Sequence, residues 1–451
     1  MVNDEVRLDR HGVTPDLPKS RSRVRGSTVF LRCFLFPLVL IAVTPSVVLL
    51  LWGCGVWLDG SLAALVTPAG FARVLRHLPA PSLSAALMIC GFVLFQAVLL
   101  KLLPGRVHRG PVTPAGVRPV YRANGIGALL VTHAVFLGAS AGLRLFPAGI
   151  LYDRFGSLLI TACLLCFGLC LVLYYRGLRR PSGPDAGSTG HPVLDYFWGT
   201  ELHPSVRGLD LKQLFNCRVG MMSWSLLTVS FGAAQYERTG SVSSAMAVSA
   251  FLQLAYILKF FYWEDGYCAT LDIMHDRFGY YLCWGVTVWL PGVYTLAGHY
   301  LVTHPRQLSW TASAALLLLG LTALALNYSA DEQKQRVRRT HGETRVWGSP
   351  PKLIHARFTT GDGETHRSLL LYSGWWGLAR HFHYLPEFLV ALAWTLPVGH
   401  GHALPYFYLV YLAVLLLDRC GRDERRCREK YGAAYEEYCQ KVRWRIIPRV
   451  Y

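Results

Sequence analysis

Charged, imidazole and aromatic side chains crowd into one stretch near the C-terminus, GWWGLARHFHYLPEF, residues 374–388. Arg380 keeps its charge and presents a planar fork of donors suited to phosphate. Trp376 and Tyr384 offer flat faces to a ring. Together these side chains fit a cofactor that carries both phosphate and an aromatic ring. The alternative is a belt of aromatic and basic residues at a membrane surface.

Upstream of this stretch, a basic segment holds Lys334 and Arg338 at positions i and i+4. On a helix these side chains lie on one face, and they supply enough charge for a further phosphate. No Gly-x-Gly-x-x-Gly motif follows a strand pattern, so we do not expect a Rossmann domain to bind this cofactor.

A second group of ionisable side chains lies in WEDGYCATLDIMHDRFGYYLCWG, residues 263–285, between two apolar stretches. Its candidates are Glu264, Asp272, His275 and Asp276, of which the last three share one face if that part is helical. Ionisable groups at membrane depth are costly, so each is a candidate functional residue. We expect a face that handles protons or binds substrate. A metal triad and a merely solvated turn are the alternatives.

The composition places these residues in a membrane protein. Of the 451 residues, 53% are hydrophobic and only 16% are charged, which is more apolar surface than one soluble core can bury. A helix needs about 20 mostly apolar residues to cross a bilayer. The clearest candidate spans are residues 29–51, 83–103, 158–175, 245–261, 279–302 and 308–326, and weaker ones are residues 125–141, 220–234, 387–398 and 405–417. We therefore predict an all-α, polytopic integral membrane protein with about ten transmembrane helices.

Lysine and arginine, 45 in all, outnumber the 27 aspartates and glutamates and cluster at the ends of the spans. The clusters before the first span, after residue 326 and from residue 419 to residue 449 are expected to face the cytoplasm. Because topology alone explains them, we expect no nucleic-acid partner. Residues 1–27 have no apolar segment before a cleavage site, so we predict a disordered cytosolic N-terminus and not a signal peptide.

The twelve cysteines follow no framework spacing. Cys163, Cys166 and Cys170 resemble a metal cluster, but they lie inside an apolar span without a histidine or carboxylate beside them. We expect small lipid-compatible side chains there, no structural metal and no essential disulfide. The longest polar loop, residues 331–369, contains Asp362 and Gly363, a pair typical of a β-hairpin turn.

Several segments resemble the membrane sterol reductases, the family that includes the delta-14 and C-24(28) reductases and the lamin B receptor. The resemblance is carried by GWWGLARHFHY, LPYFYLVYLAVLLLDRCGRDERRCREKYG, TLDIMHDRFGYYLCWG, GTELHP and PVTPAG. It runs from about residue 111 to residue 451, and residues 1–80 carry little of it.

The resemblance implies an enzyme that uses NADPH to reduce a sterol ring double bond, with the delta-7 position as the first expectation. It also implies the endoplasmic reticulum membrane, or the equivalent cell membrane in a bacterium. The bilayer, a sterol and other enzymes of sterol biosynthesis are the partners it suggests. Residues 28–330 would form the sterol pocket, and residues 331–451 a cofactor pocket open to the cytosol. Family cofactor positions match Lys334, Arg338, Leu371, Trp376, His383, Tyr384, Asp423, Cys427 and Tyr431, and Arg380 joins them by its chemistry.

Reducing an isolated double bond requires an acid that protonates one carbon while hydride adds to the other, in a pocket that excludes water. A carboxyl group in an apolar pocket has a raised pKa and can donate a proton at neutral pH. We therefore expect the acid to be Glu264 or the face of Asp272, His275 and Asp276, with a pocket tyrosine next.

The chain departs from the family pattern at Lys259, Val286, Ala297, Asp331, His383 and Glu387. The resemblance places aspartate at 259, 286 and 387, asparagine at 331 and 383, and glutamine at 297. Three other functions therefore stay open: reduction at another ring position or of another sterol, a non-catalytic sterol-binding or scaffold protein, and a methyltransferase of the isoprenylcysteine carboxyl type. Lys334 and Arg338 disfavour the methyltransferase because they suit a 2′-phosphate.

Overall fold

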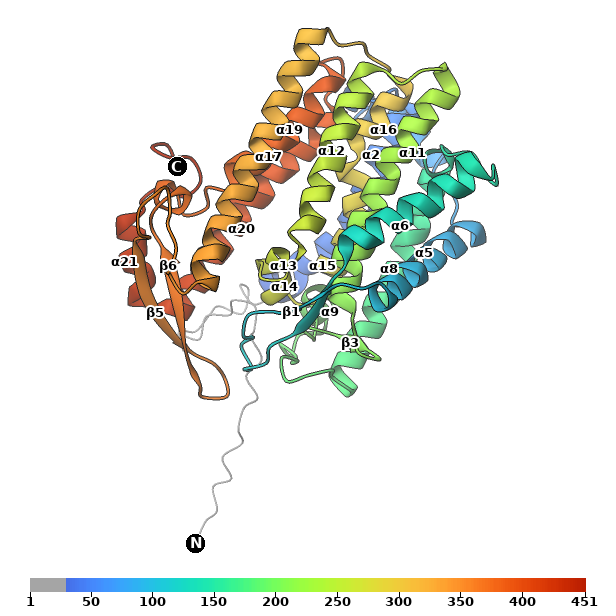
Figure 1. Ribbon diagram of the computed structural model, residues 1–451. Helices are drawn as coiled ribbons and strands as arrows, with labels where there is room; N and C mark the ends of the chain where they lie inside the picture. Colours follow the sequence, from blue (N-terminus) through green and yellow to red (C-terminus); the bar gives the residue numbers. More distant parts are fainter. Residues whose placement is uncertain (1–29) are drawn as a thin grey trace.

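The computed structural model describes residues 30–451, so the predictions for residues 1–27 lie outside the described part. Helices dominate the fold (Figure 1). Seven helical segments of the described chain are long and apolar enough to cross a membrane: Leu31–Trp57, Leu83–Leu102, Gly125–Gly142, Phe155–Arg179, Ser244–Tyr262, Trp310–Arg339 and Leu404–Tyr431. The prediction of a polytopic, helical membrane protein is confirmed.

These spans comprise η1 (Leu31–Leu35) with α2 (Phe36–Trp57), α5 (Leu83–Leu102), α6 (Gly125–Leu137) with η2 (Gly138–Gly142), α8 (Phe155–Arg179), α12 (Ser244–Tyr262), α17 (Trp310–Arg339), and η6 (Leu404–Tyr406) with α20 (Phe407–Tyr431). Serine side chains begin three of them. The hydroxyls of Ser82, Ser243 and Ser309 accept hydrogen bonds from backbone N–H groups in the first turns of α5, α12 and α17. Such caps satisfy donors that a helix start otherwise leaves unpaired.

Three further helical segments pack among the spans (Figure 1). They are α10 (Leu211–Gln213), η3 (Leu214–Gly220) and α11 (Met221–Thr239); α15 (Tyr280–Trp284), η4 (Gly285–Tyr294) and α16 (Leu296–Thr303); and α19 (Tyr384–Thr395) with η5 (Leu396–Val398). Ten is therefore an approximate count. The second segment, expected as one clear span, is irregular, and Pro291 inside η4 has no N–H to donate to the helix.

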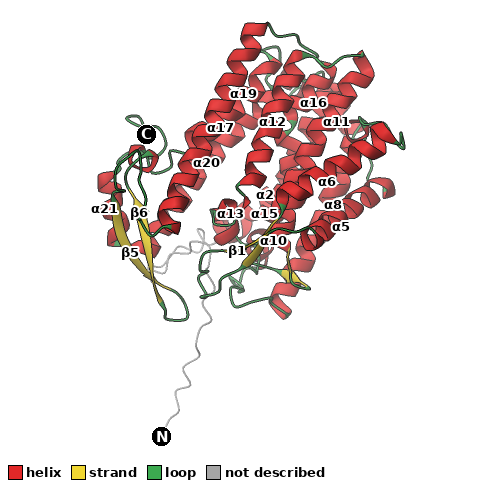
Figure 2. Cartoon of the chain, in the orientation of Figure 1, coloured by secondary structure: helices red, strands yellow, loops and turns green. Residues whose placement is uncertain are grey.

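Short helices and ribbons connect these segments. The helices are α3 (Leu62–Leu65), α4 (Pro68–Arg76), α7 (Ile150–Asp153), α9 (Pro192–Trp198), α13 (Glu264–Tyr267), α14 (Leu271–Met274), α18 (Trp375–Leu378) and α21 (Ala433–Lys441). The strands pair as antiparallel ribbons (Figure 2): β1 (Arg106–Arg109) with β2 (Val120–Ala123), β3 (Ser205–Val206) with β4 (Leu209–Asp210), and β5 (Leu353–Thr359) with β6 (Thr365–Leu371).

The predicted hairpin turn is confirmed between β5 and β6. Asp362 accepts hydrogen bonds from the Thr360 hydroxyl at 2.6 Å and from the Glu364 N–H at 3.2 Å, and Gly363 has φ 86°. Glycine adopts this left-handed conformation without steric cost. The Gly361 N–H at the tip donates to the carbonyl of Pro114 at 2.8 Å. The hairpin therefore joins the C-terminal part of the chain to the connection between β1 and β2.

Two helices are long enough to project from the membrane. The 30 residues of α17 span about 45 Å, whereas the hydrocarbon layer is about 30 Å thick. The last turns of α17 and α20 lie beside the β5–β6 hairpin and α21 (Figure 1). We call this the basic end of the bundle, because both last turns carry basic side chains.

A buried ion pair ties irregular segments together inside the bundle. Arg218 in η3 lies 2.6 Å from Glu264 at the start of α13, and both side chains are at most 1% exposed. Glu264 also accepts from the Gly125 N–H at 2.9 Å, and Arg218 donates to Asn124 at 2.7 Å. The pair therefore holds η3, α13 and the start of α6 in one arrangement.

We expect Arg218→Ala to destabilise the fold by about 3–5 kcal/mol, because it leaves Glu264 buried without its counter-charge. The control is Arg106→Ala, which removes an exposed ion pair with Asp265 and should shift stability much less. Thermal unfolding in detergent, followed by tryptophan fluorescence, measures both. Equal shifts would show that the buried pair has no special structural role.

Candidate functional site

One face of α17 runs from the bundle interior to the basic end. Asn327, Asp331, Lys334 and Arg338 are spaced four, three and four residues apart, so they lie on one stripe of the helix. Asn327 is buried, Asp331 and Lys334 are half-buried, and Arg338 is exposed. The helix thus presents polar groups at increasing distance from the membrane interior.

Aromatic rings from α18 and α19 face this stripe. The Lys334 ammonium lies 3.7 Å from the centre of the Trp376 ring, whose Nε1 donates to the carbonyl of Ala330 at 2.8 Å. The centre of the His383 ring lies 5.1 Å from that of Trp376 and 4.2 Å from that of Tyr384. Four residues predicted to contact the cofactor therefore come together here.

The basic end supplies the other candidates. Asp423, Cys427 and Tyr431 follow one another at intervals of four on α20 and are half-buried. The Tyr431 hydroxyl lies 3.3 Å from that of Ser368 on β6. Leu371, the last residue of β6, is buried in the cluster that contains Trp376.

Arg380 is placed differently from the prediction that it binds phosphate. Its Nε and Nη2 donate to Glu424 at 2.9 and 2.7 Å, and its Nη1 donates to the carbonyls of Val442 and Arg443 at 2.6 and 2.9 Å. The guanidinium is buried and directs its donors into the protein. This geometry favours a structural role, in which Arg380 anchors the C-terminal tail to α20.

The acidic candidates of residues 263–285 do not share a helical face, which corrects that expectation. α14 ends at Met274, so His275 and Asp276 lie beyond it. Asp272 accepts from Arg419 at 2.8 and 2.9 Å, and Asp276 accepts from Arg422 at 3.1 and 3.0 Å. Both arginines belong to α20.

These contacts stabilise ionised carboxylates. Burial alone would raise the pKa of Asp276, but the hydrogen bond from His275 and the charge of Arg422 lower it to about 2. Glu264 lies 2.6 Å from Arg218. Each of these three carboxylates is an ion-pair partner of an arginine, so the geometry favours Glu264, Asp272 and Asp276 as anchors for arginine. Their role as proton donors, and that of His275, stays a prediction.

A polar network that the sequence reasoning did not single out lies between α12, α17 and α19. The Tyr256 hydroxyl donates to Glu387 at 2.6 Å, and Asn327 donates to the other oxygen of Glu387 at 3.1 Å. Lys259 donates to Asn327 at 2.5 Å and lies 3.6 Å from Asp331. Asn327 also donates to the carbonyl of His383 at 3.0 Å, so four departures from the family pattern meet around it. In the sequence, the signal that could have revealed this network is the occurrence of polar side chains inside apolar spans.

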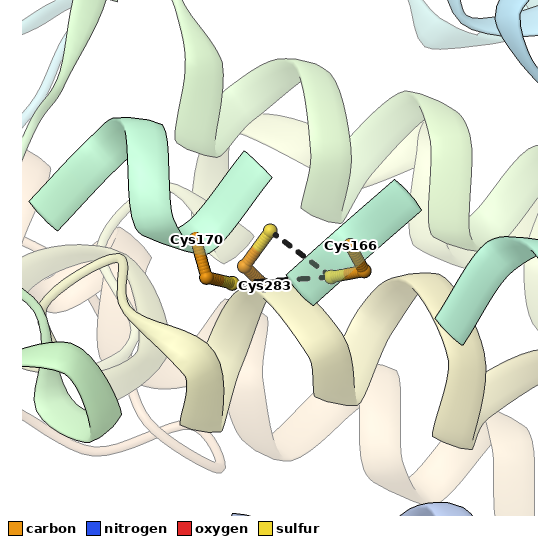
Figure 3. A group of neighbouring side chains, drawn as sticks. All are labelled: Cys166, Cys170 and Cys283. Carbon is orange, nitrogen blue, oxygen red and sulfur yellow. Dashed lines mark hydrogen bonds between the residues drawn. The ribbon is translucent and has the colours of Figure 1, made fainter. Parts of the chain in front are cut away.

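Three cysteine sulfurs gather between α8 and α15 (Figure 3). The Cys166 sulfur lies 3.9 Å from that of Cys170 and 3.7 Å from that of Cys283. Cys283 belongs to a different helix from the other two, so spacing within one span could not reveal the group. All three are free thiols and buried. The prediction of no structural metal stays a prediction.

The fold and these contacts define a multi-pass helical membrane protein with an aromatic and basic site at one end. The model of the ergosterol biosynthesis ERG4/ERG24 family matches residues 70–451, so the chain belongs to that family. The resemblance found in the sequence motifs is thereby confirmed.

Named relatives cover almost the whole chain. The chain is 46% identical to a 7-dehydrocholesterol reductase of Arabidopsis thaliana, over 92% of this chain and 96% of the relative. It is 38% identical to a Delta(14)-sterol reductase of Methylotuvimicrobium alcaliphilum, over 92% of this chain and 94% of the relative. It is also 38% identical to a 7-dehydrocholesterol reductase of Xenopus laevis, over 83% of this chain and 82% of the relative. Sterol reductases are oxidoreductases that need a reduced nicotinamide cofactor.

The buried His381 gives a prediction about pH. It is 3% exposed and stacks on Tyr384 at 5.5 Å between ring centres. Burial lowers its pKa from 6.5 to about 4. Between these two pKa values the imidazole is protonated in the unfolded chain but neutral in the folded chain. The free energy of unfolding therefore decreases as the pH falls from about 6.5 towards 4.

We expect the wild type to lose up to about 3 kcal/mol more than His381→Gln over this range. Thermal unfolding midpoints at pH 7.5, 6, 5 and 4 measure the difference. The control is His355→Gln, at an exposed position on β5, which should keep the wild-type slope. A His381→Gln slope identical to wild type would contradict the assignment.

Proposed function

We propose that the chain reduces a sterol ring double bond, with the delta-7 bond as its first substrate, and that its cofactor is NADPH. The 7-dehydrocholesterol reductase of A. thaliana, 46% identical over 92% of the chain, supports the choice of bond. The observation that carries the proposal is the meeting of the basic α17 stripe with the aromatic side chains of α18 and α19.

The site fits a phosphorylated dinucleotide. Lys334 faces the Trp376 ring. Neither Lys334 nor the exposed Arg338 forms a salt bridge to any described residue. Two cations without a salt bridge to a described residue, four residues apart at the basic end, suit phosphate groups, including the 2′-phosphate that distinguishes NADPH from NADH. Asp423, Cys427 and Tyr431 would bound the site from α20. When bound, NADPH would supply the hydride.

The protein's own groups would do the remaining work. Trp376, His383 and Tyr384 would hold a flat ring at the inner end of the stripe. The apolar helices would exclude water and admit a sterol from the bilayer. Asp272 would hold Arg419 close to the Tyr384 ring.

We propose the endoplasmic reticulum membrane, or the equivalent cell membrane in a bacterium, as the location. We also propose that residues 28–330 form most of the sterol pocket and residues 331–451 most of the cofactor site. The division is one of roles, since α17 continues across residue 330. Other sterol-biosynthesis enzymes would be partners in the same membrane.

Reduction at the delta-14 bond is the second candidate, favoured by the Delta(14)-sterol reductase that is 38% identical over 92% of the chain. An anaerobic assay of the detergent-solubilised protein with NADPH separates the two. Loss of the conjugated-diene absorbance of 7-dehydrocholesterol, with cholesterol identified by mass spectrometry, supports the delta-7 bond. Conversion of only a delta-14 sterol supports the second candidate, and no conversion of either contradicts the proposal.

We expect the double variant Lys334→Ala, Arg338→Ala to weaken NADPH binding by about 100-fold, because it removes two charge-assisted contacts to phosphate. NADH binding should change much less, because that ligand lacks the 2′-phosphate. Titration of each nucleotide, followed by calorimetry, gives both affinities.

The matched control is Arg336→Ala with Arg339→Ala on the same helix. Arg336 donates to the carbonyl of Arg345, and Arg339 is paired with Glu332. This variant should bind NADPH like the wild type. Unchanged NADPH affinity in the Lys334, Arg338 variant would refute the cofactor assignment.

A further inference from the structure

Three buried thiols from two helices meet between α8 and α15 (Figure 3). The Cys166 sulfur lies 3.9 Å from that of Cys170 on the same helix and 3.7 Å from that of Cys283 on α15. All three sulfurs lie within 4.8 Å of one another, and each side chain is at most 2% exposed. The packing of the bundle therefore holds three sulfur donors in one place.

The spacing of these sulfurs suits a single metal ion. A bond between a metal and a thiolate sulfur is about 2.3 Å long, and three such bonds in a plane would place the sulfurs about 4 Å apart. The two distances from Cys166 are close to this value. The group could therefore accept an ion between its sulfurs with little movement of α8 against α15.

The donor atoms select the kind of ion. Sulfur is a soft ligand, which favours Cu(I) over the hard cations Mg²⁺ and Ca²⁺ that take oxygen ligands. Zn²⁺ in a structural site almost always takes four ligands, whereas only three side chains of the described residues form this group. Three sulfurs without a fourth donor therefore fit Cu(I) best.

The apolar surroundings favour an ion of low charge. The three thiols belong to the main hydrophobic core, where a net charge is costly. When one Cu(I) ion replaces the proton of one thiol, and the other two sulfurs act as neutral donors, the net charge of the group remains zero. One S–H bond breaks, one S–Cu bond forms, the proton leaves to water, and no electron is transferred.

A narrow pocket adjoins the thiols and gives a cation a route to them. Cys170 lines this pocket together with the carboxylates of Asp195 and Glu201, both of which are buried. Oε2 of Glu201 has no hydrogen-bond partner among the described residues, and it lies 3.9 Å from Nη1 of Arg176. Carboxylates that line a pocket raise the local concentration of cations there.

A second group of side chains with ligand atoms close together, His381, Cys420 and Glu424, is less suited to a cation. Three arginines pair with the Glu424 carboxylate: Arg380, Arg428 and Arg445. Because arginine cannot lose its charge in a protein, a metal ion there would meet three fixed positive charges.

We propose that Cys166, Cys170 and Cys283 form a binding site for one Cu(I) ion. The site differs from the structural metal that the sequence argues against, because apolar side chains of α8 and α15 already pack against each other around the thiols. The sequence argument considered the cysteines of one span, and Cys283 is the ligand that their spacing could not show. The proposal does not rest on the proposed function.

The test is an anaerobic titration of the full-length, detergent-solubilised protein with Cu(I), in competition with a coloured chelator. The X-ray absorption spectrum of the loaded wild type should show about three sulfurs at about 2.3 Å from the ion. Cys166→Ser and Cys283→Ser should each weaken binding by at least about 100-fold, because each removes a direct ligand, and loss of an outer partner alone costs about 10- to 100-fold. Cu(I) should raise the thermal unfolding midpoint of the wild type but not of these variants.

Cys163→Ser is the matched control. Cys163 is also a buried thiol and lies one turn before Cys166 on the same face of α8, but it does not belong to the group of three. This variant should bind Cu(I) like the wild type. Cys54→Ser, at a buried position of the same core on α2, shows how a buried serine hydroxyl by itself affects the fold.

Several results would overturn the proposal. They are a wild type that binds no Cu(I) against the chelator, an unchanged affinity in Cys166→Ser or Cys283→Ser, and an equal loss of affinity in Cys163→Ser and Cys54→Ser. If the variants at the proposed ligands do not fold, the absorption spectrum of the wild type decides, because nitrogen or oxygen neighbours in place of sulfur would place the ion elsewhere.

Discussion

The fold depends on pairing charges that are buried or largely buried. Arg218, Arg419 and Arg422 each meet one carboxylate of the segment between α12 and α15. An unpaired charge in such surroundings costs several kcal/mol, so each arginine restricts where its partner segment can lie. Because Arg419 and Arg422 come from α20, the same pairs that place residues 263–285 also fix the helix that bears Asp423, Cys427 and Tyr431. The acidic segment and the proposed cofactor site are therefore parts of one electrostatic arrangement.

The long α17 connects two environments that would otherwise be separate. Its apolar part packs against α12 and α19, and its last turns carry cations into water at the basic end. Arg338 is exposed there, whereas Asn327 is buried against Glu387. In the proposed site, one rigid element would thus set the distance between a phosphate group outside the membrane and the reacting part of a ligand inside it.

The sequence predicts the spans well because bilayer thickness sets their length and composition, as in α5 and α8. It also predicts the grouping of Trp376, His383 and Tyr384, since these lie within a few residues of one another. It does not reveal the Tyr256–Glu387 contact, whose partners are 131 residues apart, or the meeting of Cys283 with Cys166. The sequence does not reveal the Glu424 partner of Arg380 either, because an arginine suits a phosphate and a carboxylate equally well, and only the fold places Glu424 beside it. A charge in a sequence gives no sign of which partner it will find.

The α17 stripe also limits how chains of this kind can change in length. A helix turns by about 100° per residue, so inserting or deleting one residue between Asn327 and Arg338 would swing one end of the stripe away from the other. In a connection such as the loop between α17 and β5, an added residue does not rotate side chains about a helix axis. We therefore expect gain or loss of residues to be tolerated in connections, and the interval from Asn327 to Arg338 to keep a constant length.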